Sequence, residues 1–417
     1  MRILFLDAYF QPEQIAFTHL ENDLLEGLTK EGHVVEVICP IPTRGVSNEV
    51  AKKYKSKKSE TLYGGRVRVT RFSAPREGKN PLIRAIRYFW CNLRTYQIGK
   101  RANAVDVVFA NSTPPTQGLT AGIVAKKLKA PFVYSLQDIF PDSLVTTGLA
   151  EKNTVLVRLG SYLEKNTYKM CASIIVLSNS MKNNLLHKGV REEFVHVVSN
   201  WIDLDAVHQI SKTENRLFDE FGISRQKYIV LYAGNFGAAQ GAEIVLDAAE
   251  MLQDQTDIQF VIFGGGAGYK SAETRAKLLD NVFIHPILSQ KRISEVYSMG
   301  DVALITCKKG VGKSGMPSKT WSIMACNTPI IASFDLNSDL AEIIVGSGIG
   351  CCVEPENSDL LSKSIMQHYR LHLGKESSMG RCYVEHTVSK EACVAKYIDI
   401  ISNSYINYIR NNGRSNN

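Results

Sequence analysis

The chain has 417 residues, of which 44% are hydrophobic and 22% are charged, so its composition is that of a globular protein with more than one domain, and a disordered or fibrous chain is excluded. Its net charge of +8 is unevenly placed, because residues 44–101 contain 16 basic and only 3 acidic residues. The N-terminal sequence MRILFLDAYFQPEQ is interrupted by Asp7, Pro12 and Glu13, so we expect no signal peptide, and no apolar stretch is long enough to predict a membrane-spanning helix. The nine cysteines are scattered without a C-x-x-C pair, which favours reduced thiols and a cytoplasmic protein.

Short apolar runs alternate with helical patterns along the first half of the chain. This alternation is typical of a parallel sheet with crossover helices. The predicted strands are Arg2–Asp7, Val34–Cys39, Val67–Phe72, Val105–Ala110, Phe132–Leu136, Ser173–Leu177 and Phe194–Val198. The predicted helices include Thr18–Glu31, Pro81–Arg101, Thr116–Leu128, Val155–Cys171 and Ser178–Lys188.

The basic segment 44–101 begins with a lysine-rich run, Lys52 to Lys58, and ends in the predicted helix Pro81–Arg101. One side of that helix carries Leu82, Ile86, Phe89, Trp90, Leu93 and Gln97, and Arg84, Arg87, Arg94 and Arg101 fall near the other. Such a helix can lie on an anionic membrane surface, or its apolar side can pack on its own domain while the basic side is solvated. The sequence contains no recognition motif for nucleic acid, so we expect no such partner.

The second half repeats the alternation. Its predicted strands are Tyr228–Ala233, Gln259–Phe263, Val282–Ile284, Val302–Ile305 and Pro329–Ala332, and its predicted helices include Gly241–Gln253, Lys291–Ser298 and Ser318–Ala325. We therefore expect an α/β protein with two Rossmann-like, doubly wound parallel-sheet domains, residues 1–200 and 201–389, that face a ligand-binding cleft. The last helix, within residues 390–410, is expected to pack back on the first domain.

Residues 310–333 combine a glycine-rich loop with a predicted helix start at Pro317, Ser318 and Lys319. Proline at the first helical position suits a helix start, and free amides, the helix dipole and nearby lysines attract an anion. The alternative is an ordinary loop-to-helix connection with solvated lysines.

Two glycine-rich turns are expected after strands of the second domain. The first spans Tyr232 to Gly237 and includes Gly234 and Asn235; the second spans Gly264 to Gly268 and includes Gly265. Neither completes the G-x-G-x-x-G pattern, but together with Lys319 they predict a nucleoside diphosphate site in the second domain.

In the first domain, Gln137 and Asp138 directly follow a predicted strand. Asp138 at this position can bind a substrate hydroxyl or act as an acid or base, or it can form a turn before Pro141. His368 and His372 have helical spacing but lack the glutamate of a zinc motif, so we expect no metal site.

Several blocks of the sequence resemble the retaining glycosyltransferases of family 4, which have the two-domain GT-B architecture. The matching blocks are LQDIFPDSLVTTG at 136–148, VLSNSM at 176–181, VVSNWIDL at 197–204, VLYAGNFGAAQGAEIVLDAA at 230–249 and MPSKTWSIMACNTPIIASFDLNSDLAEII at 316–344. The resemblance is strongest to a branch that includes bacterial O-antigen and capsule L-fucosaminyl (N-acetyl-6-deoxyhexosamine) transferases.

The resemblance implies roles for particular residues. Asn235, Gly237 and Gln240 would lie beside the donor diphosphate, and Ser318 and Lys319 would stabilise it. Many family members carry an arginine and a lysine at the first and third of these positions, two glutamates at the positions of Ser314 and Ser322, and a Gly-Gly loop where Gln14 begins the sequence QIAF. The site that the resemblance implies therefore comprises, for the donor, Gly234, Asn235, Gly237, Gln240, Gly265, Ile287, Pro317, Ser318, Lys319 and Ser322; for the donor sugar and acceptor, Gln14, Gln137, Ser314 and Gly315; and for catalysis, Asp138 and Lys319.

The resemblance also implies an activity: transfer of a sugar, such as an N-acetylated 6-deoxyhexosamine, with retention of configuration. The donor would be a UDP-sugar and the acceptor a saccharide on a polyprenyl diphosphate, at the inner face of a bacterial plasma membrane that segment 44–101 contacts. We expect no cofactor and no metal ion. Two alternatives stay open: an enzyme like the nucleotide-sugar 2-epimerases, and an inactive membrane-associated partner subunit.

Overall fold

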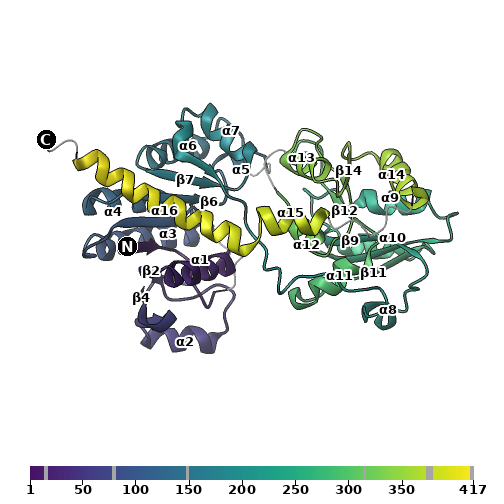
Figure 1. The fold of residues 1–417 in the computed structure, drawn as a ribbon, viewed down its shortest axis with the longest axis horizontal. Coiled ribbons are helices and arrows are strands. Elements are labelled where there is room, and N and C mark those ends of the chain that lie inside the picture. The colour runs from purple at the N-terminus through teal and green to yellow at the C-terminus, as the bar shows by residue number, and fades with distance from the viewer. Residues whose placement is uncertain (14–16, 78–80, 147–149, 313–315, 372–378, 414–417) are drawn as a thin grey trace. The chain divides into compact units, whose positions relative to one another are not determined.

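The computed structural model describes residues 1–13, 17–77, 81–146, 150–312, 316–371 and 379–413. The chain forms two compact units (Figure 1). The first comprises Met1–Ser199 and Cys393–Asn417, and the second comprises Asn200–Ala392. The sequence places the first boundary at residues 200/201, next to this division.

The first unit is built on one sheet whose strands follow the order β3-β4-β2-β1-β5-β6-β7-β8. The strands are β1 (Arg2–Leu6), β2 (Val34–Pro40), β3 (Ser59–Leu62), β4 (Val67–Phe72), β5 (Val107–Asn111), β6 (Phe132–Leu136), β7 (Ser173–Val176) and β8 (Val195–Val197). The helices are α1 (Thr18–Lys30), α2 (Asn48–Ser56), α3 (Pro81–Gly99), α4 (Gln117–Leu128), α5 (Asp142–Thr146), α6 (Val155–Tyr168), α7 (Asn179–His187) and α16 (Lys390–Gly413). Strands β5, β6 and β7 are mostly apolar and are buried at every residue, as expected of parallel strands that are covered on both faces.

The last helix, α16, belongs to the first unit from Cys393 onward and lies against its sheet (Figure 1). The Tyr397 hydroxyl is 3.1 Å from Ser135 Oγ of β6, and Ser404 Oγ is 2.8 Å from Ser173 Oγ of β7. A Cβ atom on Gly27 of α1 would lie 2.3 Å from Val394 Cγ1, so glycine is required for α1 and α16 to approach this closely. Residues from the two ends of the chain therefore complete one core.

Two elements of the basic segment differ from the expectation. Residues 48–56 form α2, and β3 pairs antiparallel with β4 at the edge of an otherwise parallel sheet. The reason lies in Arg71 of β4, which is 3% exposed. Its guanidinium binds Glu60 of β3 at 2.7 Å and lies 4.6 Å from the ring centre of Tyr54. The strand and helix thus cover a buried arginine.

The predicted position of Arg87 on the solvated side of α3 is also wrong. Arg87, predicted on the solvated side, is 1% exposed and donates a hydrogen bond to the carbonyl of Pro75. Cys91 and Thr95, about one and two turns farther along the helix, are buried as well. By contrast Phe89 is 71% exposed and Ile86 is 55% exposed. The side of α3 that carries Arg87, Cys91 and Thr95 therefore packs on the first unit. The side that carries Phe89 and Ile86 does not.

The second unit is built on a sheet that is parallel throughout, in the order β11-β10-β9-β12-β13-β14. Its strands are β9 (Tyr228–Asn235), β10 (Ile258–Gly265), β11 (Val282–Pro286), β12 (Val302–Thr306), β13 (Ile330–Ser333) and β14 (Gly350–Val353). Its helices are α8 (Leu217–Glu220), α9 (Glu243–Met251), α10 (Tyr269–Ala276), α11 (Ile293–Met299), α12 (Lys319–Ala325), α13 (Asp339–Gly346), α14 (Ser358–Leu371) and α15 (Met379–Thr387). Both units thus confirm the predicted α/β class with parallel, doubly wound sheets, apart from β3.

No helix among the described residues is both long enough and apolar enough to span a bilayer.

Candidate functional site

The predicted glycine-rich turns of the second unit are continuations of strands. Strands β9 and β10 pair up to their last residues, with Gly234 opposite Gly264 and Asn235 opposite Gly265. This corrects the expectation that a turn begins at Tyr232. A Cβ on Gly264 would lie 2.8 Å from the rings of Phe236 and Tyr269. The glycines therefore let aromatic rings pack against the strand ends.

The chain reverses just beyond these strand ends. The Phe236 N–H donates to the Gly265 carbonyl at 2.7 Å, and the Gly268 N–H donates to the Phe236 carbonyl at 2.8 Å. Gly266 between them has a φ of +91°, a conformation that favours glycine. The loops after β9 and β10 are thus bound to each other at the carboxyl edge of the sheet, where doubly wound folds bind ligands.

Lys319, the first residue of α12, reaches this edge. Its Nζ lies 3.3 Å from the Ala233 carbonyl oxygen of β9 and 4.4 Å from the ring centre of Tyr232. A Cβ on Gly234 would lie 3.0 Å from the same Nζ. Burial lowers the pKa of Lys319 to about 8, and the described residues give its ammonium no carboxylate partner. A partly buried cation without a counter-ion is poised to bind an anion.

The aromatic support of Lys319 is a residue that sequence reasoning missed. Tyr232 is fully buried, and its hydroxyl donates to the Asn235 carbonyl at 3.0 Å. Its ring face attracts the ammonium, while its hydroxyl fixes the backbone at the end of β9. The only signal in the sequence is an aromatic residue two positions before Gly234.

Gly237 and Gln240 lie in the loop after β9. The Gln240 N–H donates to the Gly237 carbonyl at 3.1 Å, and a Cβ on Gly237 would lie 2.5 Å from Gln240 Oε1. The Gln240 side chain therefore folds back over Gly237. The loop is fixed to the end of β12 by the Lys308 N–H, which donates to the Ala239 carbonyl at 3.0 Å.

On the other side of Asn235, the loop after β11 brings Ile287 to Gly265. A Cβ on Gly265 would lie 3.0 Å from Ile287 Cδ1 and 3.7 Å from Asn235 Oδ1. The Ile287 N–H donates to the Gly264 carbonyl at 2.9 Å, and the Ile287 side chain is 51% exposed. The exposed Ile287 side chain offers an apolar surface on which a flat ring can lie.

The start of α12 needs a correction. Ser318 is the N-cap, its side chain makes no capping hydrogen bond, and Pro317 precedes the cap instead of occupying the first helical position. The Pro317 carbonyl accepts the Thr320 N–H at 3.0 Å, so a turn precedes the helix. Ser322 is 8% exposed, which leaves its hydroxyl little surface for a ligand. Ser314 and Gly315 lie outside the described residues.

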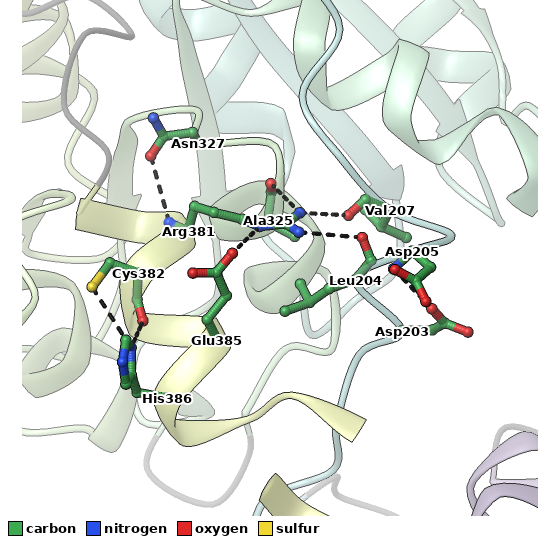
Figure 2. Close-up of polar contacts among 10 residues, drawn as sticks. All are labelled: Asp203, Leu204, Asp205, Val207, Ala325, Asn327, Arg381, Cys382, Glu385 and His386. Atoms are coloured by element: carbon green, nitrogen blue, oxygen red, sulfur yellow. Dashed lines mark hydrogen bonds and ion pairs between the residues drawn. The ribbon is translucent and has the colours of Figure 1, made fainter. Parts of the chain in front are cut away.

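Arg381 of α15 holds the far end of α12 in place (Figure 2). Its guanidinium donates to the carbonyls of Leu204 at 3.3 Å, Val207 at 3.1 Å and Ala325 at 3.5 Å. The carboxylate of Glu385 accepts a further hydrogen bond at 2.8 Å. These contacts fix the helix that carries Lys319.

The sequence contains an Asp-x-Asp motif, Asp203-Leu204-Asp205, which bears on the expectation of no metal site. Figure 2 shows both carboxylates. Asp203 Oδ1 accepts the N–H groups of Asp205 at 3.0 Å and Ala206 at 3.1 Å, so this aspartate caps a turn. Among the described residues no three His, Cys, Asp or Glu side chains gather as metal ligands would.

In the first unit, Gln137 and Asp138 follow β6 as predicted. The Gln137 N–H donates to Ser112 Oγ at 2.9 Å, and its side-chain amide donates to Ser135 Oγ at 3.2 Å. Asp138 is exposed and borders a small cavity of about 20 Å³ together with Phe140 and Glu164. Gln14 lies outside the described residues.

A buried carboxyl pair lies at the carboxyl edge of the first sheet, and sequence reasoning missed it. Asp7, just after β1, and Glu21 in the first turn of α1 are 2% and 4% exposed. The Asn111 side-chain amide donates to both carboxyl groups, at 3.4 Å to Asp7 Oδ1. Burial raises the pKa of Asp7 to about 7, and burial together with Asp7 raises the pKa of Glu21 well above its ordinary value. The two groups therefore hold at least one proton between them near neutral pH.

The structure thus brings together five of the predicted donor residues. Gly234, Asn235, Gly265, Ile287 and Lys319 meet at one edge of the second sheet. Gly237 and Gln240 adjoin them in the loop after β9.

Comparison with known proteins defines the class. Residues 22–206 match the family model "Glycosyltransferase Family 4", and residues 213–379 match the model "Glycosyl transferases group 1". The chain is therefore a transferase enzyme, a glycosyltransferase of the GT-B type.

Particular relatives agree with this class. WcaI of Escherichia coli (strain K12), which carries the name of a colanic acid biosynthesis glycosyl transferase, is 27% identical over 96% of this chain and 100% of its own. WbjE of Pseudomonas aeruginosa, named as a glycosyltransferase, is 26% identical over 78% of this chain and 82% of its own. The crystal structure of Anabaena Alr3699/HepE in complex with UDP is similar with a TM-score of 0.70 and 15% identity, covering 97% of this chain and 100% of that chain, which shows the fold alone.

Proposed function

We propose that the enzyme transfers a sugar, with retention of configuration, from a UDP-sugar to a lipid-linked saccharide in the synthesis of a bacterial surface polysaccharide such as O-antigen or capsule. The observation that carries the proposal is Lys319, a cation at the carboxyl ends of β9 and β10 to which the described part of the chain supplies no carboxylate partner. The UDP in the structure of the Anabaena relative and the polysaccharide in the name of WcaI support it. An N-acetylated 6-deoxyhexosamine such as L-FucNAc is the sugar we propose.

The chemistry follows from the charges that the reaction develops. As the bond between the anomeric carbon and the diphosphate breaks, the diphosphate gains negative charge and the sugar becomes oxocarbenium-like. A cation fixed beside the leaving group stabilises that charge more in the transition state than in the ground state, and this difference lowers the barrier. Lys319 occupies such a position if the diphosphate lies over Gly234 and Asn235. The acceptor hydroxyl then attacks on the face that the diphosphate leaves, and the diphosphate takes its proton.

The same placement suggests how the rest of the donor is held. The backbone of Gly237 and Gln240 would adjoin the diphosphate, and Ile287 with the backbone at Gly265 would contact the base. The Ser318 N–H at the start of α12 is a further donor toward the diphosphate. No step in this scheme needs a metal ion or another cofactor.

The acceptor side belongs to the first unit in this proposal. A polyprenyl-linked acceptor requires the enzyme to work at the inner face of the plasma membrane, and α3 offers a surface for that purpose. Phe89, Ile86 and Trp90 are 71%, 55% and 42% exposed, and Arg84 is an exposed cation beside them. These side chains suit an anionic bilayer surface.

Release of UDP from the UDP-sugar, with and without a lipid-linked saccharide, tests the proposal. Release that requires the acceptor supports a transferase. Donor epimerisation without an acceptor would instead favour the epimerase alternative, and a protein that binds UDP without releasing it from any donor would favour the inactive partner subunit.

Asp138→Asn is expected to lower kcat by about 10²-fold or more with little change in donor affinity, because we assign Asp138 to the reacting sugar or the acceptor hydroxyl. The side chain is exposed and borders a cavity, so the isosteric change leaves the fold intact. Initial rates and UDP titration measure the two quantities. Full activity in the variant would leave Asp138 with a role in the turn only.

A further inference from the structure

Helix α6 exposes a row of apolar side chains that the described residues of the first unit leave uncovered. Val155 is 81% exposed, Leu156 55%, Leu159 54% and Tyr162 66%. Residues 155, 159 and 162 have helical spacing, so they form one stripe, while Val157 on the inner side is buried. Contiguous apolar surface of this kind marks a contact with another apolar phase or partner.

Cations accompany this stripe. Arg158, Lys165 and Lys169 are exposed residues on α6 and at its end. The one acidic residue of α6, Glu164, has a side chain that is only 7% exposed, and Lys188 Nζ at 2.7 Å and the Tyr168 hydroxyl at 2.8 Å both bind it. The outer surface of α6 is therefore apolar and positively charged.

A cavity of about 490 Å³ lies beside the same helix. Its charged lining consists of one carboxylate, Glu164, and four cations, Lys165, Lys169, Lys188 and Arg191. Lys188 and Arg191 are bound to carboxylates, whereas the described residues give Lys165 and Lys169 no such partner. The cavity therefore offers two lysines to an anion the size of a phosphate group.

The helices next to α6 have a similar composition. Helix α3 packs on α4, and α4 packs on α6. Ile123 of α4 is 44% exposed, and the sequences of α3 and α4 contain no Asp or Glu. Three neighbouring helices thus present apolar and basic side chains with no accessible carboxylate.

We propose that α6 is a second membrane-contact element, whose apolar stripe enters an anionic bilayer while the adjacent cavity receives the phosphate of a phospholipid headgroup. This inference rests on the proposed function, which assigns membrane contact to α3 alone. The positive charge of this surface favours an anionic bilayer over a second copy of the chain. A second copy would bring like charges together, whereas an anionic bilayer has the opposite charge. The lipid-facing surface then spans α3, α4 and α6.

Vesicle flotation of the full-length protein tests the inference. At low salt the wild type is expected to bind phosphatidylglycerol-containing vesicles at least about tenfold more strongly than pure phosphatidylcholine vesicles. The double variant Leu159→Glu/Tyr162→Glu is expected to lose at least about tenfold in affinity. Leu278→Glu is the matched control, because Leu278 is 80% exposed in the second unit and its replacement is expected to leave binding unchanged.

A second variant isolates the cavity. Lys165→Gln/Lys169→Gln keeps the apolar stripe and is expected to reduce the preference for phosphatidylglycerol. If it retains that preference and loses only a thermal stabilisation by inorganic phosphate, the cavity is a site for free phosphate and the lipid assignment fails.

The remaining outcomes separate the inference from the proposed function. If the wild type floats and the α6 double variant floats equally well, only the inference about α6 is wrong. If the wild type does not float at all, the membrane part of the proposed function fails with it, while stabilisation by UDP still reports on the donor site. A concentration-dependent dimer that the α6 double variant abolishes would make this surface a contact between copies and overturn the bilayer assignment.

Discussion

Replacement of Lys319 by methionine is expected to lower kcat by about 10²–10³-fold, because loss of one fixed donor to a developing charge costs about 3–4 kcal/mol. Methionine keeps the apolar stem beside Tyr232 and removes only the charge. Lys319→Ala is expected to lose as much activity. Acceptor affinity should change far less than kcat, since Lys319 is assigned to the leaving group. Steady-state kinetics with varied donor and acceptor measure both.

The control for Lys319 is Lys363→Met on α14, an exposed lysine outside the donor site, which should retain full activity. The pH profile gives an independent readout. Because the pKa of Lys319 is about 8 in the free enzyme, kcat/KM should fall as pH rises above about 8, where the neutral amine no longer attracts the diphosphate. Equal losses in kcat and acceptor affinity, or an unchanged kcat, would remove Lys319 from the mechanism.

The Lys319→Met variant is also expected to differ from the wild type in stability. A buried ammonium without a counter-ion destabilises the folded protein, and depression of its pKa means that this penalty is present below about pH 8 and is relieved at higher pH. At pH 7 the variant should therefore be at least as stable as the wild type. Loss of activity with unchanged or raised Tm distinguishes a catalytic charge from a structural one.

The second large effect concerns the carboxyl pair of the first unit. Between pH 5 and pH 8 the free energy of unfolding of the wild type is expected to fall by about 2 kcal/mol or more through Asp7. The Asp7→Asn variant is expected to lack this decrease. In the folded protein the pKa of Asp7 is raised to about 7, whereas an aspartate in an unfolded chain has a pKa of about 3.9. Between these values the folded state binds more protons than the unfolded state, so the pair stabilises the fold fully at low pH and loses that contribution as pH rises toward 7.

Urea denaturation at pH 5 and pH 8 measures this effect, with each variant compared with the wild type at both values. The free energy of unfolding of the wild type should fall more between pH 5 and pH 8 than that of Asp7→Asn. Asp106→Asn serves as the control, because that carboxylate is partly exposed directly before β5 and has no buried acid beside it among the described residues. An identical pH dependence in the wild type and Asp7→Asn would show that the pair does not share a proton.

Many strands of the two sheets could be predicted from the sequence, because the patterns that indicate a strand are local. The strands Phe132–Leu136 and Val67–Phe72 occur with the predicted bounds. The first is a short run that is buried throughout, and in the second buried residues alternate with less buried ones over the first four positions, so each has a local pattern typical of a strand. The meeting of Gly234 and Gly265 at one edge of the second sheet was also predicted. Both glycines lie in the last two residues of neighbouring parallel strands, and the carboxyl ends of such strands must meet.

Tertiary structure decided the features that depend on partners distant in the chain. The inward face of α3 was set by Arg87 and its carbonyl acceptor, which a helical projection of the sequence does not contain. The raised pKa values of Asp7 and Glu21 come from burial, because β1, α1 and β5 together remove both carboxyl groups from water. The sequence by itself determined which segments form the two sheets and that Lys319 follows a loop. Its contact with Tyr232 and the depressed pKa came from folding, since burial and proximity are properties of the packed chain.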